Sequence, residues 1–140
     1  MPQVSVSQIQ AALEPHSRAL AAAYLFGSHA RGTAHRESDL DVAVLFDRQA
    51  LPDAGQRQEE VERLRVGLME ALRMNRVDVV SLNDAPPELA KAVVDSGRRV
   101  VCRQPDADHA FRRDAQLRYA DIKPFLDRTR RRKLDALRGR

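Results

Sequence analysis

A glycine–serine pair and two nearby aspartates are the residues of this chain best suited to chemistry. Gly27-Ser28 follows the apolar run 21–26, and Asp39-Leu40-Asp41 begins after ten intervening residues. A glycine lets the backbone approach a ligand without a Cβ in the way, and the following N–H groups can face a phosphate. Two carboxylates two residues apart on a strand project from one face, about 6.6 Å apart, and can converge on metal ions. The spacing therefore predicts a phosphate site beside a metal site, an arrangement suited to nucleotide chemistry.

The segment that contains LFGS, ARG and SDLDVAV, from Tyr24 to Phe46, resembles the nucleotidyltransferase superfamily with the DNA polymerase β-like fold. Within that superfamily the chain resembles the minimal nucleotidyltransferases. These are small single-domain proteins, commonly the antitoxin of a pair whose toxin is a HEPN-domain ribonuclease. The similarity continues more weakly over residues 76–102. The full spacing of Gly-Ser, ten residues and Asp-x-Asp is specific, whereas Asp-x-Asp alone is not.

The resemblance implies roles for the residues of this segment and for one later acid. Asp39 and Asp41 would hold Mg²⁺, in a two-ion site, and Gly27 and Ser28 would carry the phosphates of ATP. Asp78, on a neighbouring strand, would complete the catalytic set, either as a third metal ligand or as the group that draws the proton from the attacking hydroxyl.

Plainer structural roles stay open for several of these positions. Asp78 stands among valines in RVDVVSL, where a buried carboxylate needs a partner, and it could instead face solvent from a half-exposed strand. Arg31 would either neutralise triphosphate charge or cover the sheet edge. Ser38 would either orient a carboxylate or cap the turn before the strand. For Asp39 and Asp41 the alternative is a strand cap and an exposed acid, which the upstream Gly-Ser spacing disfavours.

Strands and helices must hold these residues in place, and the apolar pattern indicates where they lie. Short apolar runs predict strands at Ala21–Phe26, Asp39–Phe46 and Val77–Leu82, with a further strand segment at Val100-Val101. Together with the helices they predict an α+β fold of the polymerase β-like type, in which helices cover one face of a small mixed sheet.

Helices are expected between and after these strands. Ser7 is the predicted N-cap of a first helix that reaches Ala19, with Gln10 completing a capping box and Pro15 interrupting it. Apolar residues at helical spacing predict a helix over 56–74. Further helices are predicted over 86–96, ending at the C-cap Gly97, and over 107–137, with a possible break at Pro124.

The positive charge of the chain belongs to its C-terminal part. The net charge is +4, yet residues 103–140 hold twelve Lys or Arg against six Asp. This asymmetry divides the chain into a minimal nucleotidyltransferase domain at 1–103 and a basic helical tail at 104–140, which either belongs to the same domain or docks a partner. An acidic protein surface or a nucleic acid would suit such a tail, but it contains no recognisable nucleic-acid module, so nucleic acid is not expected to be a direct ligand.

Length and composition limit the remaining possibilities. The 140 residues suffice for one domain with one core, and no apolar run approaches the ~18 residues that span a bilayer. The start of the chain lacks the pattern of a signal peptide. The single cysteine, Cys102, excludes an internal disulfide and suits a reducing compartment. The expected location is therefore the cytoplasm, without membrane association.

The resemblance predicts a Mg²⁺-dependent enzyme that transfers AMP from ATP to a tyrosine hydroxyl of a HEPN toxin, and so neutralises it. Two other interpretations remain open from the sequence. The chain could sequester the toxin by binding alone, with catalysis secondary or absent. It could also transfer nucleotides to a small molecule or to an RNA end.

Overall fold

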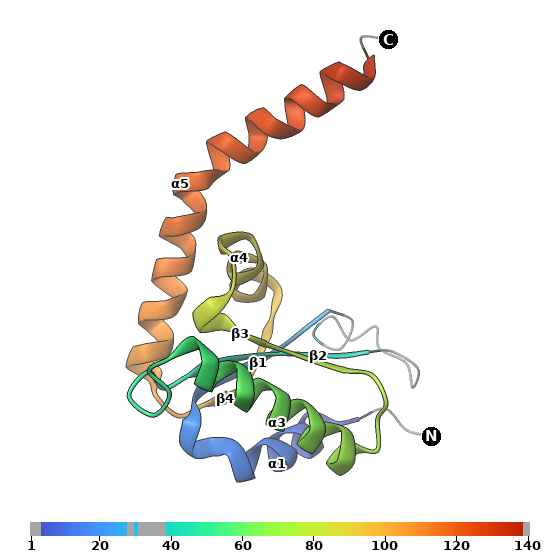
Figure 1. The fold of residues 1–140 in the computed structure, drawn as a ribbon, viewed down its shortest axis with the longest axis vertical. Coiled ribbons are helices and arrows are strands. Elements are labelled where there is room, and N and C mark those ends of the chain that lie inside the picture. The colour runs from blue at the N-terminus through green and yellow to red at the C-terminus, as the bar shows by residue number, and fades with distance from the viewer. Residues whose placement is uncertain (1–3, 28–29, 31–38, 139–140) are drawn as a thin grey trace.

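A computed structural model describes residues 4–27, 30 and 39–138, and it places a four-stranded mixed sheet at the centre of the molecule (Figure 1). The strands are β1 (Leu20–Phe26), β2 (Leu40–Phe46), β3 (Val77–Ser81) and β4 (Arg98–Cys102), in the order β3-β2-β1-β4. β1 is antiparallel to both β2 and β4, whereas β2 and β3 are parallel. The predicted α+β class and mixed sheet are confirmed.

Helices cover both faces of this sheet, not one face as the sequence pattern suggested. On one face, α1 (Val6–Leu13) and α3 (Ala54–Leu72) pack their apolar side chains against the sheet. On the other face lie α4 (Pro87–Ser96) and the first part of α5 (Pro105–Arg138). β1 and residues 42–46 of β2 are continuous apolar runs, which is typical of strands that are enclosed between two layers.

The first helix begins two residues earlier than predicted. Ser5 is the N-cap, and its hydroxyl and the side chain of Gln8 form the capping box that was assigned to Ser7 and Gln10. The chain contains the Ser-x-x-Gln pattern twice, so the pattern alone does not fix the start. Gln10 donates instead to the carbonyl oxygen of Val100 at 2.7 Å, which ties α1 to β4. As expected, the α-helix stops before Pro15, and a 3-10 helix, η1 (Glu14–Ala19), continues to β1.

The second layer depends on a glycine between α4 and β4. Gly97 is the C-cap of α4, as predicted, and its N–H donates to the carbonyl of Val93. A Cβ at Gly97 would lie 2.4 Å from that carbonyl oxygen and 3.2 Å from the carbonyl oxygen of Leu25 in β1. Only a glycine therefore lets the chain pass between α4 and the sheet at this distance.

A buried polar cluster fastens α5 to the sheet. Asp108, which is 1% exposed, accepts hydrogen bonds from the hydroxyl of Tyr24 in β1 and from Arg99 Nη1 in β4 at 2.9 Å. Arg112 donates to the Tyr24 oxygen at 3.2 Å and to the carbonyl of Val94 at 3.3 Å. Burial, reinforced by the hydrogen bond to Asp108, raises the pKa of Tyr24 to about 12, so its O–H remains available as a donor at neutral pH.

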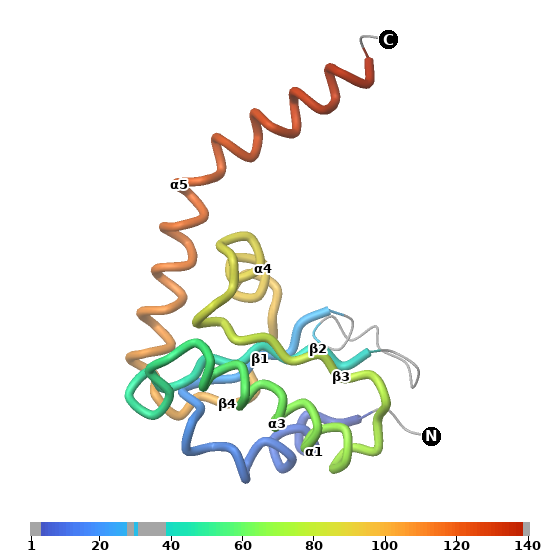
Figure 2. Tube along the Cα trace, viewed as in Figure 1, coloured from blue at the N-terminus to red at the C-terminus, as the bar shows by residue number. Residues whose placement is uncertain are grey.

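The last helix is one continuous element of 34 residues, about 51 Å long. It runs from Pro105 to Arg138 without the break considered at Pro124, although it changes direction part-way along (Figure 2). Pro124 lacks an N–H and crowds the preceding turn, which is a physical cause of such a bend. Its distal part extends away from the rest of the molecule (Figure 1). Within the described residues, no helix is both long and apolar enough to cross a membrane.

Candidate active site

Three strand ends meet at one corner of the sheet and bring the predicted catalytic residues together. The last residue of β1, Phe26, pairs with Asp41 near the start of β2, and Asp41 pairs in turn with Asp78 near the start of β3. Neighbouring strands are about 4.8 Å apart, and residues in register on adjacent strands point to the same face. The carboxylates of Asp41 and Asp78 are therefore close neighbours, although their positions are 37 residues apart in the sequence.

Strand alternation also decides the face on which these acids lie. Asp41 alternates in phase with Ala43 and Leu45, and Asp78 with Val80, all of which belong to the core beneath α4 and α5. α5 meets the sheet at the far end of β2 (Figure 1), so it does not cover the end where the acids stand. Asp78 is accordingly exposed, and the side chain of Asp39 is 52% exposed. Asp41 and Asp78 are therefore held by the sheet, and the residues that the structure describes leave Asp39 and Asp78 exposed.

Gly27 lies directly against the Asp41 carboxylate. Its φ is +71°, in the left-handed region that side chains disfavour, and a Cβ placed there would lie 2.6 Å from Asp41 Oδ2. The glycine is required for two reasons: the backbone must turn immediately after β1, and the space that a side chain would fill is occupied by the carboxylate. The predicted phosphate residue and the predicted metal ligand thus lie side by side.

Asp39 lies close to Arg76, a residue to which the sequence assigned no role. Arg76 Nη1 lies 3.8 Å from Asp39 Oδ1, and the carbonyl of Arg76 accepts from the N–H of Leu40 at 2.9 Å. Because both side chains are exposed, this ion pair contributes little to stability. It does mean that the carboxylate of Asp39 has a cation beside it. Arg76 comes just before β3, so only the β2–β3 register could have revealed the contact.

Carboxylate oxygens on two adjacent chain segments, the start of β2 and the start of β3, are the ligand type that Mg²⁺ prefers. Among the described residues, however, no three His, Cys, Asp or Glu side chains are already arranged to hold a metal ion. Carboxylates repel one another when no cation lies between them, and Asp39 faces Arg76. The residue types and the open corner beside Gly27 fit a magnesium ion, and the assignment of Asp39, Asp41 and Asp78 as its ligands stays a prediction. Ser28, Arg31 and Ser38, the other predicted site residues, lie outside the described residues.

Comparison with known proteins decides the family. Residues 7–106 match the family model described as polymerase beta, nucleotidyltransferase, which covers the sheet and every acid of the site. The chain belongs to the polymerase β nucleotidyltransferase family. The resemblance inferred from the Gly-Ser and Asp-x-Asp spacing is confirmed.

The relatives of this nucleotidyltransferase include antitoxins. It is 32% identical over 107 residues to the protein adenylyltransferase MntA of Shewanella oneidensis, covering 76% of this chain and 71% of MntA. It is 31% identical to a chain of a toxin–antitoxin crystal structure with AMP-PNP, with a TM-score of 0.66, covering 90% of this chain and 98% of the other. A third relative comes from the complex of a tri-AMPylated S. oneidensis HEPN toxin with an MNT antitoxin: 28% identity, a TM-score of 0.58, and coverage of 89% and 94%.

For this nucleotidyltransferase, Gly27→Ala is expected to weaken both the fold and the site. The left-handed backbone costs an alanine about 1–2 kcal/mol, and the new Cβ must displace the Asp41 carboxylate. We expect a loss of that size in urea unfolding and a roughly tenfold weaker affinity for MgATP by calorimetry. Gly55→Ala is the matched control, because Gly55 lies in the first turn of α3 without a positive φ, and its Cβ would be 3.2 Å from Asp53 Oδ1. Equal effects of the two substitutions would contradict the special role of Gly27.

Proposed function

We propose that this nucleotidyltransferase transfers AMP from ATP to a tyrosine hydroxyl of a HEPN toxin, and thereby acts as its antitoxin in the cytoplasm. The observation that carries the proposal is the strand register, which aligns Gly27, Asp41 and Asp78 side by side at an open corner of the sheet. The relatives support the acceptor: one is a protein adenylyltransferase, and another was solved with an AMPylated HEPN toxin. The lone Cys102 suits a reducing compartment.

The proposed binding step follows from the position of Gly27. Without a Cβ, the turn after β1 lets the triphosphate approach the backbone, and the N–H groups that follow would donate to its oxygens. Asp39 and Asp41 would hold magnesium, which when bound supplies positive charge to the phosphate oxygens. Ser28 and Arg31 would add a hydroxyl and a cation to the phosphate site, and Ser38 would orient the neighbouring carboxylate.

The proposed transfer step needs a proton acceptor beside the attacking hydroxyl. Asp78 is exposed and next to Asp41, which supports a role for its carboxylate as the group that would take the tyrosine proton. The tyrosine oxygen then forms a bond to the α-phosphorus, the bond from that phosphorus to the bridging oxygen of the β-phosphate breaks, and pyrophosphate leaves. The product tyrosine carries an AMP group, whose bulk and negative charge would hinder RNA binding beside it.

Transfer of label tests the proposal directly. The chain is incubated with Mg²⁺, the purified HEPN-domain protein of the source organism, and ATP labelled at either the α- or the γ-phosphate. We expect the HEPN protein to acquire the α-label and not the γ-label. A stable complex without any labelled protein would instead favour an antitoxin that acts by binding alone. Label that appears on RNA or a small molecule would favour the second alternative.

A further inference from the structure

The distal half of α5 extends away from the described part of the domain (Figure 1). In the described part of the chain, the last α5 residues to interact with the domain body through their side chains are Gln116, which donates to Asp95 at 2.9 Å, and Tyr119, whose ring lies 5.6 Å from Lys91 Nζ. The helix continues for about five more turns (Figure 2). An isolated helix of that length is only marginally stable in water, because helices in proteins depend on packing.

The helix face that packs on the domain continues into this distal half. Phe111 and Ala115 contribute to the core beside α4, and the positions that follow at alternating spacings of three and four are Arg118, Ile122, Phe125 and Thr129. We call these six residues the α5 face. Such 3–4 spacing is the pattern that lets one helix pack along another. Phe125 is nevertheless 63% exposed, so the α5 face offers an apolar surface that this chain does not cover.

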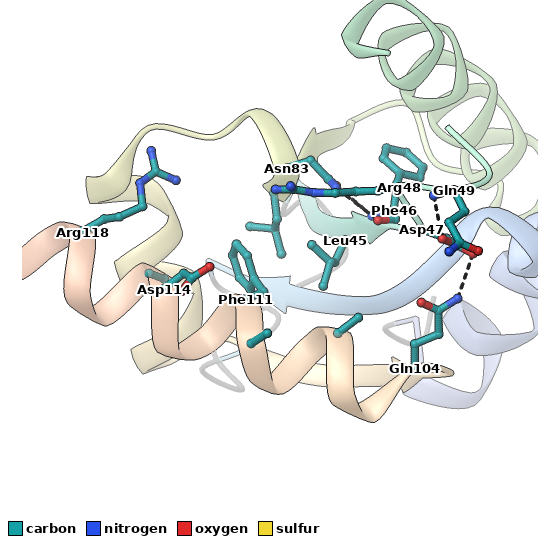
Figure 3. Close-up of a pocket in the computed structure, with 14 residues that line it drawn as sticks. Leu45, Phe46, Asp47, Arg48, Gln49, Asn83, Gln104, Phe111, Asp114 and Arg118 are labelled. Carbon is teal, nitrogen blue, oxygen red and sulfur yellow. Dashed lines mark hydrogen bonds between the residues drawn. The ribbon is translucent and has the colours of Figure 1, made fainter. Parts of the chain in front are cut away.

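A pocket lies at the base of the same face. It has a volume of about 580 Å³ and is formed by the first turns of α5, the end of β2 and the short 3-10 helix η2 (Leu82–Asp84). Phe111 and Leu45 form its apolar floor, and Arg118 reaches its rim from α5 (Figure 3). The pocket is separate from the active site, since it opens at the end of β2, about 17 Å along the strand from Asp41.

Hydrogen bonds fix the wall of the pocket opposite α5. The side chain of Asn83 accepts from the N–H of Phe46 at 2.8 Å and donates to its carbonyl at 3.1 Å, and Gln104 donates to Asp47 at 3.0 Å (Figure 3). The pocket is therefore preformed, which lowers the entropy that is lost when a partner binds. Its lining holds two exposed arginines, Arg48 and Arg118, and two aspartates, Asp47 and Asp114, so the pocket carries no net charge and suits an apolar side chain.

The charge of α5 indicates whether the α5 face binds a second copy of this chain or a different partner. Residues 118–138 hold eight Lys or Arg and three Asp. Two such helices side by side would bring like charges together, which opposes self-association. The excess of positive charge lies in residues 128–138, which hold six Lys or Arg and one Asp. An acidic helix would meet opposite charge there, and its apolar side chains would cover Ile122 and Phe125.

We propose that the α5 face and the pocket at its base form one docking surface, which binds an amphipathic, acidic helix of the HEPN toxin. This inference rests on the proposed function for the identity of the partner. One apolar side chain of the toxin helix fills the pocket above Phe111, and its next turns lie along Ile122 and Phe125. Docking by α5 leaves the corner of the sheet at Asp41 open, so the same toxin molecule or a neighbouring one presents its tyrosine there.

Two substitutions on the α5 face test the docking surface, each with a matched control on the same helix. Phe125→Glu and Arg118→Glu are expected to weaken the calorimetric affinity for the HEPN protein by about 30-fold or more, as for a central interface residue. Leu117→Glu controls for the first, since Leu117 is 59% exposed and turned about 120° from the centre of the face. Arg113→Glu controls for the second, because Arg113 is exposed on the far side. MgATP affinity should be unchanged in all four.

The outcomes separate this inference from the proposed function. If the toxin binds all four variants equally well, the docking surface is wrong, whether or not AMP is transferred. If binding depends on Phe125 and Arg118 but the α-label never reaches the toxin, the docking surface stands and the proposed enzyme activity fails. Sedimentation that shows a dimer of this chain, lost in Phe125→Glu, would assign the face to self-association. Binding of RNA that requires Arg118 but not Phe125 would also overturn the proposal.

Discussion

Asp41→Asn is expected to slow AMP transfer by about 10³-fold or more while leaving the fold intact. Asp41 stands at the centre of the site, because it pairs with Phe26 on one side and with Asp78 on the other, and its Oδ2 lies against Gly27. Asparagine keeps the shape but removes the charge that would hold magnesium. That ion provides several kcal/mol of charge stabilisation, and every 1.36 kcal/mol is a factor of ten in rate.

The measurement is the initial rate of α-label transfer to the HEPN protein, with unfolding by urea recorded for each variant. Glu59→Gln removes one negative charge from an exposed position of α3 and should retain the full rate, so it controls for the change in net charge. Asp41→Asn should still bind the toxin, because the proposed docking surface lies at the other end of β2. A variant that retains most of the transfer rate would rule out Asp41 as an essential ligand.

The sequence could predict that Gly27 and Asp41 lie together because the two residues are close along the chain. Gly27 and Asp41 belong to one strand–loop–strand segment, whose apolar runs determine the two strands. Asp78 is a different case: no local pattern says which strand lies beside β2, and its place came from the resemblance to the family. The parallel β2–β3 register then brought Asp78 next to Asp41. Register depends on the whole set of packing contacts, which a single segment does not contain.

The sequence did not predict the pocket or the buried cluster, because both are formed by segments that are far apart in the chain. The pocket at the base of α5 combines the end of β2, η2 and α5, none of which carries a recognisable motif. Asp108 was also overlooked, because a charged residue in a basic helix is ordinarily expected to face water. A signal was nevertheless present: Asp108, Phe111 and Ala115 share helical spacing with apolar residues that face the core. An acid on the apolar face of a helix predicts a buried partner.

Asp108→Ala is expected to lower the free energy of unfolding by about 3 kcal/mol. The substitution removes the acceptor for Tyr24 and for Arg99, and it leaves the Tyr24 hydroxyl without an acceptor inside the core. Arg99 is half-exposed, so water can solvate its charge. The loss of stability is therefore smaller than for a buried ion that loses its partner. For a domain of this size the loss corresponds to a fall of roughly 10 °C in Tm, measurable by circular dichroism.

A control in the same helical turn distinguishes burial from helix electrostatics. Asp106 is exposed in the first turn of α5, where a negative charge favours the helix N-terminus by about 0.3–1 kcal/mol. Asp106→Ala should therefore cost no more than that. Tyr24→Phe should cost about 1–3 kcal/mol, because it removes the hydrogen bonds of the hydroxyl with Asp108 and Arg112 but leaves Asp108 paired with Arg99. If Asp108→Ala is no more harmful than Asp106→Ala, the buried cluster does not hold α5 to the sheet, and the base of the docking surface has another source of rigidity.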